Sequence, residues 1–317
     1  RHDAILFKLM NKGLKVDLGL AFNQNLDAFQ VDGTYYVPGN VAPFIKDSKG
    51  NLTATPSGLI PLVGLNGLSS KAGNLALINP PSTNALGQNY KSMQFLYVSK
   101  SIKSSKWSGL LISDQYGSYT NDSTKYIVGS DTGYVFGRRY HSKMLHARVT
   151  AGLTTQGFIS KKISWNGGIY YQTGHDKDGL ALDAYSSTLS LQFQNKQLNY
   201  VLGWDFLSGN DSFSSTSTNH RFDPLYGTPH KFWGLMDYFY AGTGSPVGGL
   251  SDIYFKSKYN SINNKITSSI DLHYFSFAAN QKSIDNQKLN PFLGFEVDWV
   301  SNFTINQSSI LEFGISY

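Results

Sequence analysis

The chain has 317 residues, a formal net charge of +6 and no cysteine, and only 15% of its residues are charged. The charged fraction lies well below the quarter that is typical of soluble domains. The lack of cysteine excludes a disulfide framework and cysteine-based zinc or redox chemistry. Lys and Arg are spread along the sequence without forming a block, which argues against a nucleic-acid-binding arm.

The dominant pattern along the chain is alternation of apolar and polar residues between turn residues, which predicts β-strands. In 181–194, for example, Leu189 and Leu191 fall on one face, while Thr188 and Ser190 fall on the other. No apolar run reaches the roughly 18 residues of a membrane-spanning helix. In chain order, the predicted strands are 4–10, 14–23, 91–100, 106–116, 138–154, 161–173, 181–194, 198–208, 248–259, 264–276, 292–305 and 310–317.

The length of these segments favours strands that cross a membrane. Most run for about 9–14 residues, which suits a tilted strand in a bilayer, whereas strands of soluble sandwiches usually have about 5–6. We therefore predict an all-β fold, a transmembrane antiparallel up-and-down β-barrel, with about 12 strands in a single domain over 1–317. A soluble all-β protein that binds or hydrolyses carbohydrate is the less favoured alternative.

Short and long connections alternate along the chain. The short ones lie at 11–13, 101–105, 156–160, 195–197, 260–264 and 306–309, and the long ones at 24–90, 117–137, 174–179, 209–247 and 277–288. In outer-membrane barrels the short turns are periplasmic and the long loops extracellular. This order would place both chain ends at the outer surface, where barrel termini do not normally lie. We therefore expect an incomplete chain that lacks terminal strands.

The stretch 202–240 contains LGWDFLSGND and FDPLYGTPHKFWGLMDYFY, and DLHYF, LGFEVDW and LEFGISY follow at 271–275, 293–299 and 311–317. In these residues the chain resembles the alginate-export family of outer-membrane barrels. The resemblance implies a porin-like barrel of about 18 strands when complete, in the outer membrane of a Gram-negative bacterium. It also implies export of an anionic polysaccharide.

The polar faces of the predicted strands carry charges of both signs, which in a barrel point into the lumen. They could form a selectivity lining for a charged or hydroxyl-rich solute, with Arg148, Lys256 and Lys258 as its cationic part. The alternative is an internal salt-bridge network that braces a plugged barrel. The candidate pore-lining residues are Lys8, Lys15, Asp17, Arg148, Gln172, Asp205, Asp252, Lys256, Lys258, Asp271, His273, Glu296 and Asp298.

Two long loops are candidates for functional elements, because loops of such length are usually functional or disordered. We expect 24–90 to fold over or into the pore as a constriction, or else to be a surface loop. The loop 209–247 includes a possible short helix at 230–240. Its aromatic residues could stack on sugar rings or form a small core of their own; they include Phe222, Tyr226, His230, Phe232, Trp233 and Tyr238.

The sequence has no nucleophile elbow and no phosphate-binding glycine loop, and the spacing of its histidines fits no metal-ligand motif. We therefore expect no catalytic residues, no metal and no cofactor. The expected function is an outer-membrane channel that passes an anionic or hydroxyl-rich solute such as a polysaccharide. The alternative is a loop-plugged barrel that serves as a structural or interaction subunit of an envelope complex. Expected partners are outer-membrane lipid, an anionic polysaccharide solute and envelope-complex proteins, but not nucleic acid.

Overall fold

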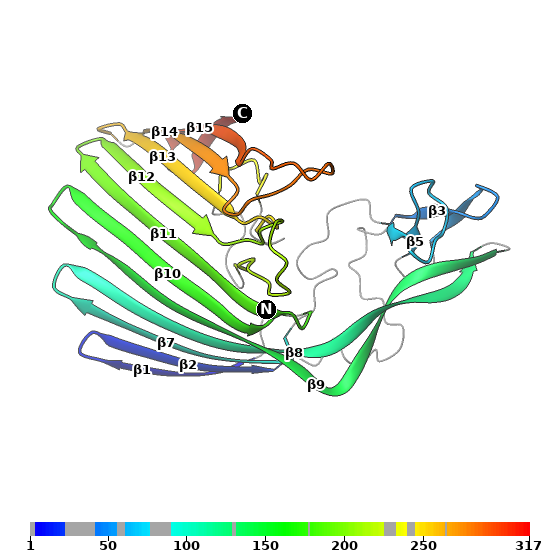
Figure 1. Ribbon diagram of the computed structural model, residues 1–317. Helices are drawn as coiled ribbons and strands as arrows, with labels where there is room; N and C mark the ends of the chain where they lie inside the picture. The colour runs from blue at the N-terminus through cyan, green and yellow to red at the C-terminus, as the bar shows by residue number, and fades with distance from the viewer. Residues whose placement is uncertain are drawn as a thin grey trace.

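The structure, a computed structural model, describes residues 4–22, 42–55, 61–76, 90–128, 131–176, 178–224, 233–239, 245–263 and 265–317. A single 12-stranded sheet dominates it, as Figure 1 shows. The strands of this sheet are β1 (Ala4–Asn11), β2 (Leu14–Phe22), β7 (Ser92–Ile102), β8 (Ser105–Val128), β9 (Asp131–Phe158), β10 (Ile163–His175), β11 (Ala181–Asn195), β12 (Leu198–Leu207), β13 (Leu250–Asn260), β14 (Ile266–Ser276), β15 (Phe292–Asn306) and β16 (Ser309–Ser316).

The topology is up-and-down, and every predicted strand is confirmed. Each strand of the large sheet pairs antiparallel with the next one in the chain, in the order β1-β2-β7-β8-β9-β10-β11-β12-β13-β14-β15-β16. The sheet is curved, and its short turns gather along one end (Figure 1). In the part of the chain that is described, β1 and β16 are not paired with each other, so the sheet is open.

The two faces of the sheet differ in chemistry because successive side chains of a strand point to opposite sides. On the apolar face, large side chains are exposed, among them Leu189 (54%), Leu202 (58%) and Phe295 (58%). No second sheet among the described strands covers them, as a soluble sandwich would require. The other face, here called the polar face, holds buried Arg148 and Asp252. Lipid is therefore the solvent that suits the apolar face.

The predicted loop at 117–137 is wrong, because β8 and β9 continue through it as a two-stranded ribbon. The pairing shifts register between Gly117 and Tyr119, then resumes from Tyr119↔Tyr140 to Val128↔Asp131. The ribbon leaves the sheet at this irregularity (Figure 1). Its sequence is too polar to show the alternation of a strand with one face in lipid, and such a sequence predicts a loop.

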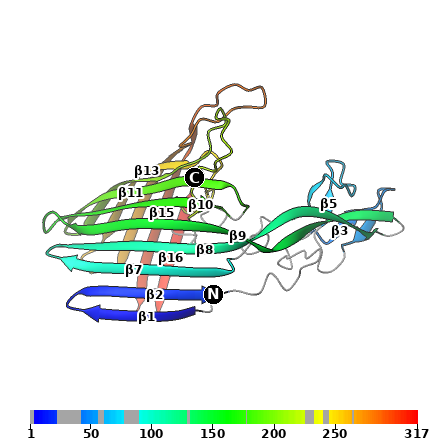
Figure 2. The ribbon, with the colours of Figure 1, turned by 60° about the horizontal axis from the view of Figure 1, so that its bottom comes forward.

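The described parts of 24–90 form two small hairpins, β3 (Phe44–Lys46) with β4 (Leu52–Ala54), and β5 (Leu62–Val63) with β6 (Asn74–Leu75). They lie beside the ribbon, away from the sheet (Figure 2). A bridge joins Pro61 to Val135, and the Tyr134 amide donates to Ser69 Oγ at 2.8 Å. The expected constriction over the pore is therefore wrong for these residues, because they pair with the ribbon and lie away from the sheet (Figure 2).

The predicted short helix at 230–240 is absent from its described part, 233–239, where the chain forms bends. Nowhere in the described ranges does a helix have the length and apolar character needed to cross a membrane.

Candidate functional site

The strand register places every predicted pore-lining residue on the polar face. Lys8 lies opposite Asp17, Asp205 opposite Asp252, and Asp271 opposite Asp298. Whether they line a pore remains a prediction. What the sequence pattern did not predict is how these residues are joined to each other and to the loop 209–247.

Arg148 of β9 is the centre of the first cluster and is only 1% exposed. Its Nε and Nη2 atoms donate to the two carboxylate oxygens of Asp114 at 3.1 and 2.5 Å, and Nη2 also contacts the Tyr116 hydroxyl. Its Nη1 donates to Asp223 Oδ2 of the loop at 3.1 Å. A buried guanidinium is stable only when its charge is balanced and its donors are bonded. Here the carboxylates of Asp114 and Asp223 balance the charge and accept the hydrogen bonds.

Gln172 of β10 fixes the same point of the loop. Its Nε2 donates to the Asp223 carbonyl at 2.8 Å, while the Asp223 amide donates to Gln172 Oε1 at 3.0 Å. The Gln172 side-chain amide thus forms two hydrogen bonds with the Asp223 backbone, as the backbone of a paired strand would. Together with Arg148 it pins the loop to the polar face above β9 and β10.

Two aromatic residues of the loop join an apolar cluster on that face whose other members belong to the strands. Phe222 and Trp233 are 6% and 5% exposed. Tyr238 is exposed and packs edge-on against Phe239, and Tyr226, His230 and Phe232 lie outside the described residues. The buried cluster consists of Leu182, Ala184, Leu207, Phe222, Trp233, Leu250 and Phe275.

A second anchor holds the loop at β15. The amides of Leu235 and Met236 donate to Glu296 Oε1 at 2.7 and 2.8 Å, and the Leu235 amide also lies 3.2 Å from Asp298 Oδ2. Gly234 precedes them with φ +89, and a Cβ there would lie 2.3 Å from Glu296 Oε1. Only glycine fits this approach without strain. The described parts of the loop are therefore bonded to the polar face at β9 and β10 through Asp223 and at β15 through Leu235 and Met236.

Gly234→Ala is expected to weaken this second anchor by more than about 1 kcal/mol, because alanine is strained at positive φ and its Cβ meets the Glu296 carboxylate. Limited proteolysis of vesicle-inserted protein should show faster cleavage within 209–247. Gly109→Ala is the matched control, since a Cβ at Gly109 meets nothing within 4 Å. Equal cleavage of the two variants would contradict the anchor.

The loop is also tied to its neighbour, 277–291. Asn280 Nδ2 donates to Asp211 Oδ2 at 2.8 Å, and Gln281 Nε2 donates to the Asn210 carbonyl at 2.7 Å. The Phe213 amide, followed by the Asn280 side chain, lowers the pKa of the Asp211 carboxyl. Asp211 is therefore charged, and the tie intact, throughout the neutral pH range.

Most other charges of the polar face form a row across β12 to β15 in which carboxylates outnumber cations, whereas Lys8, Lys15 and Asp17 lie on β1 and β2. Asp252 Oδ2 contacts His273 Nδ1 at 2.8 Å, and Lys256 Nζ contacts Asp271 Oδ2 at 3.0 Å. Asp205 accepts from the Thr188 hydroxyl at 2.5 Å. Arg148 and Lys256, which the sequence favoured as cationic lining, are thus each neutralised by carboxylates.

The Asp252–His273 pair has the geometry of the acid–base half of a catalytic triad. However, His273 Nε2 has no hydrogen-bond partner in the described structure, so no nucleophile adjoins it there. Across the same residues, no group of three or more His, Asp and Glu side chains could hold a metal ion. The row offers charge and hydrogen bonds to a passing solute.

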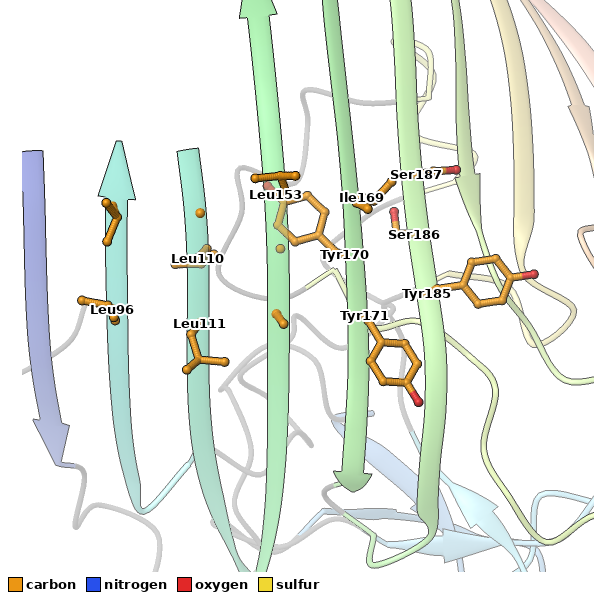
Figure 3. Close-up of a pocket in the computed structure, with 14 residues that line it drawn as sticks. Leu96, Leu110, Leu111, Leu153, Ile169, Tyr170, Tyr171, Tyr185, Ser186 and Ser187 are labelled. Carbon is orange, nitrogen blue, oxygen red and sulfur yellow. The ribbon is translucent and has the colours of Figure 1, made fainter. Parts of the chain in front are cut away.

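A cavity of about 640 Å³ lies elsewhere, on the apolar face between β7 and β11. Leu96, Leu111, Leu153 and Ile169 line it (Figure 3). Because these side chains face outward from the sheet, lipid chains are the natural filling of this groove, and it is not part of the polar site.

The features of the sheet define a transmembrane β-barrel protein, a class that belongs to outer membranes. They are one antiparallel up-and-down sheet, long strands, an exposed apolar face and a polar face with charges. No protein-family model and no curated protein matches the chain, so the alginate-export resemblance stays a prediction.

The solved structures that are similar to this chain include two bacterial proteins. One is the toluene transporter TodX of Pseudomonas putida, with a TM-score of 0.33 and 11% identity over 99% of this chain and 76% of that chain. The other is the outer membrane channel DcaP of Acinetobacter baumannii, with a TM-score of 0.40 and 8% identity over 99% of this chain and 84% of that chain.

Proposed function

We propose that this protein is a passive channel of the outer membrane and that the loop 209–247 forms its constriction. The observation that carries the proposal is the position of the loop, which lies on the polar face and is bonded at Arg148 and at Glu296. In a barrel the polar face lines the lumen, and a loop fixed on it narrows the passage and adds its own groups to the lining.

Of the two solute classes expected from the sequence, hydroxyl-rich solutes fit the polar face better than anionic ones. Of the three candidate cations, Arg148 and Lys256 are bound by carboxylates, and Lys258 lies at the next position toward the short turns on the same face. Glu296 and Asp298 lie side by side at the loop. A negative lining repels anions at short range. Export of an anionic polysaccharide, which the family resemblance implies, is therefore the less favoured form of this proposal. No catalytic step is part of it.

Planar-bilayer recording on the purified protein tests the channel. Wild-type protein should give discrete conductance steps. A variant with a short Gly/Ser linker in place of 223–239 should give larger ones, because it lacks both anchors and Trp233 of the buried cluster. Heat-modifiable gel mobility of both proteins serves as the control for folding.

A sealed barrel that acts as a subunit of an envelope complex is the second candidate, favoured by the deep burial of the first anchor, Arg148. A wild-type protein that is silent while the linker variant conducts would support the sealed barrel. Silence of both folded proteins would contradict the channel altogether.

A further inference from the structure

The short turns of the sheet carry a set of lysines that the channel proposal does not use. Lys12 lies between β1 and β2, Lys103 between β7 and β8, and Lys196 between β11 and β12. Antiparallel pairing brings these turns to the same end of the sheet (Figure 1). This lysine rim consists of Lys12, Lys103, Lys161, Lys162, Lys196 and Lys265.

The rim is unbalanced in charge. The turn segments 12–13, 103–104, 159–162, 196–197, 261–265 and 307–308 contain no Asp or Glu. The whole chain has 27 Lys and Arg against 21 Asp and Glu, so its surplus of six positive charges equals the number of rim lysines. All six are exposed, and none forms an ion pair within the described ranges.

Aromatic side chains of the apolar face show where this rim lies relative to the membrane. Trp107 of β8 and Trp165 of β10 contact each other edge-to-face, with ring centroids 6.3 Å apart, just inside the short turns. Trp107 is 40% exposed, and its Nε1 donates to Ser105 Oγ at 3.1 Å. Tryptophans with a wet polar end are typical of the boundary between hydrocarbon and headgroups.

The lysines lie beyond that boundary, at the level of the headgroups. Lys103 lies four residues before Trp107 and Lys162 three residues before Trp165, in the adjoining turns. Apolar side chains lie there too, such as Ile102 and Ile159, which are 49% and 66% exposed. Long lysine stems can cover such apolar surface while the ammonium reaches the phosphates. Clustered cations beside a membrane attract anionic lipids.

We propose that the lysine rim binds the headgroups of anionic phospholipids in the leaflet that the short turns face, which is the periplasmic leaflet for this class of barrel. The proposal goes beyond the channel and does not depend on it, since a sealed barrel would carry the same rim. It concerns lipid selection around the protein.

Quenching of tryptophan fluorescence by brominated lipids tests it, because Trp107 and Trp165 lie next to the rim. In vesicles of phosphatidylcholine and phosphatidylglycerol, brominated phosphatidylglycerol should be preferred over brominated phosphatidylcholine by about fivefold, as expected for about 1 kcal/mol from one lysine per lipid. In 1 M salt, where the Debye length is about 3 Å, the preference should nearly vanish.

Two matched variants locate the effect. Replacement of all six rim lysines by glutamine should reduce the preference to near parity. A control variant with the same number of lysines replaced by glutamine at the opposite end, Lys46, Lys49, Lys71, Lys125, Lys282 and Lys288, should retain it. Equal quenching by both lipids in wild-type protein, or equal loss in both variants, would overturn the proposal. Should the rim variant fail to insert, the salt dependence of wild-type protein still decides.

Discussion

Arg148→Met is expected to lower the free energy of unfolding by about 3–5 kcal/mol, because it leaves a buried carboxylate without its counter-charge. Asp114 is 0% exposed and takes both of its guanidinium bonds from Arg148. The substitution also removes the ion pair to Asp223, so the loop should separate from β9 and the conductance steps should become larger. Urea unfolding in lipid vesicles, followed by tryptophan fluorescence, measures the first effect, and bilayer recording measures the second.

Two comparison variants distinguish the lost charge from the lost packing. The double variant Arg148→Met/Asp114→Asn removes both members of the pair and should recover most of the lost stability, since replacing a whole buried pair costs far less than breaking it. Arg148→Lys keeps the charge but not the two-pronged geometry, and should fall between wild type and Arg148→Met. A loss of less than about 1 kcal/mol in Arg148→Met, which is roughly the value of an exposed ion pair, together with unchanged conductance steps, would show that the cluster does not hold the loop.

Leu189→Arg is expected to destabilise the membrane-inserted protein by about 2–4 kcal/mol, the cost of an arginine near the middle of the lipid-facing surface of a barrel. Leu189 belongs to β11 and is 54% exposed on the apolar face. In water the same substitution would be harmless at such an exposed position, so the size of the effect identifies the solvent of this face.

Gln192→Arg is the matched control, because Gln192 is on the same strand but on the polar face. It should cost less than about 1 kcal/mol, since substitutions in the lumen mainly tune selectivity. Unfolding of both variants in urea and vesicles gives the difference. Equal costs for the two arginines would contradict the assignment of the two faces and, with it, the membrane location.

The strands were predictable because their signal is local. Alternation within 181–194 or 292–305 reports which side of one strand faces lipid, and it needs no knowledge of neighbouring strands. Because alternation depends on one face lying in lipid, it did not predict the strands at 117–137. A ribbon that stands in water on both sides has no reason to alternate, so it resembles a loop in sequence although its backbone pairs throughout.

The site was predictable only in part, because its contacts join distant positions. The face of Arg148 follows from strand parity, but its partners Asp114 and Asp223 are 34 and 75 residues away along the chain. Gly234 carries a signal that could have been noticed, since it interrupts the aromatic run FWGLMDYFY. The lysines are spread along the sequence, and only the repeated hairpins bring those of the turns together in space.

The β8–β9 ribbon has one more consequence. From Tyr119 to Val128 it continues past the register shift, and at about 3.3 Å per residue this adds roughly 30 Å to the height of the protein. A bilayer including its headgroups is only about 40–45 Å thick. The ribbon up to Val128, with the small hairpins beside it, therefore extends well beyond the lipid surface at the end of the sheet opposite the short turns (Figure 2).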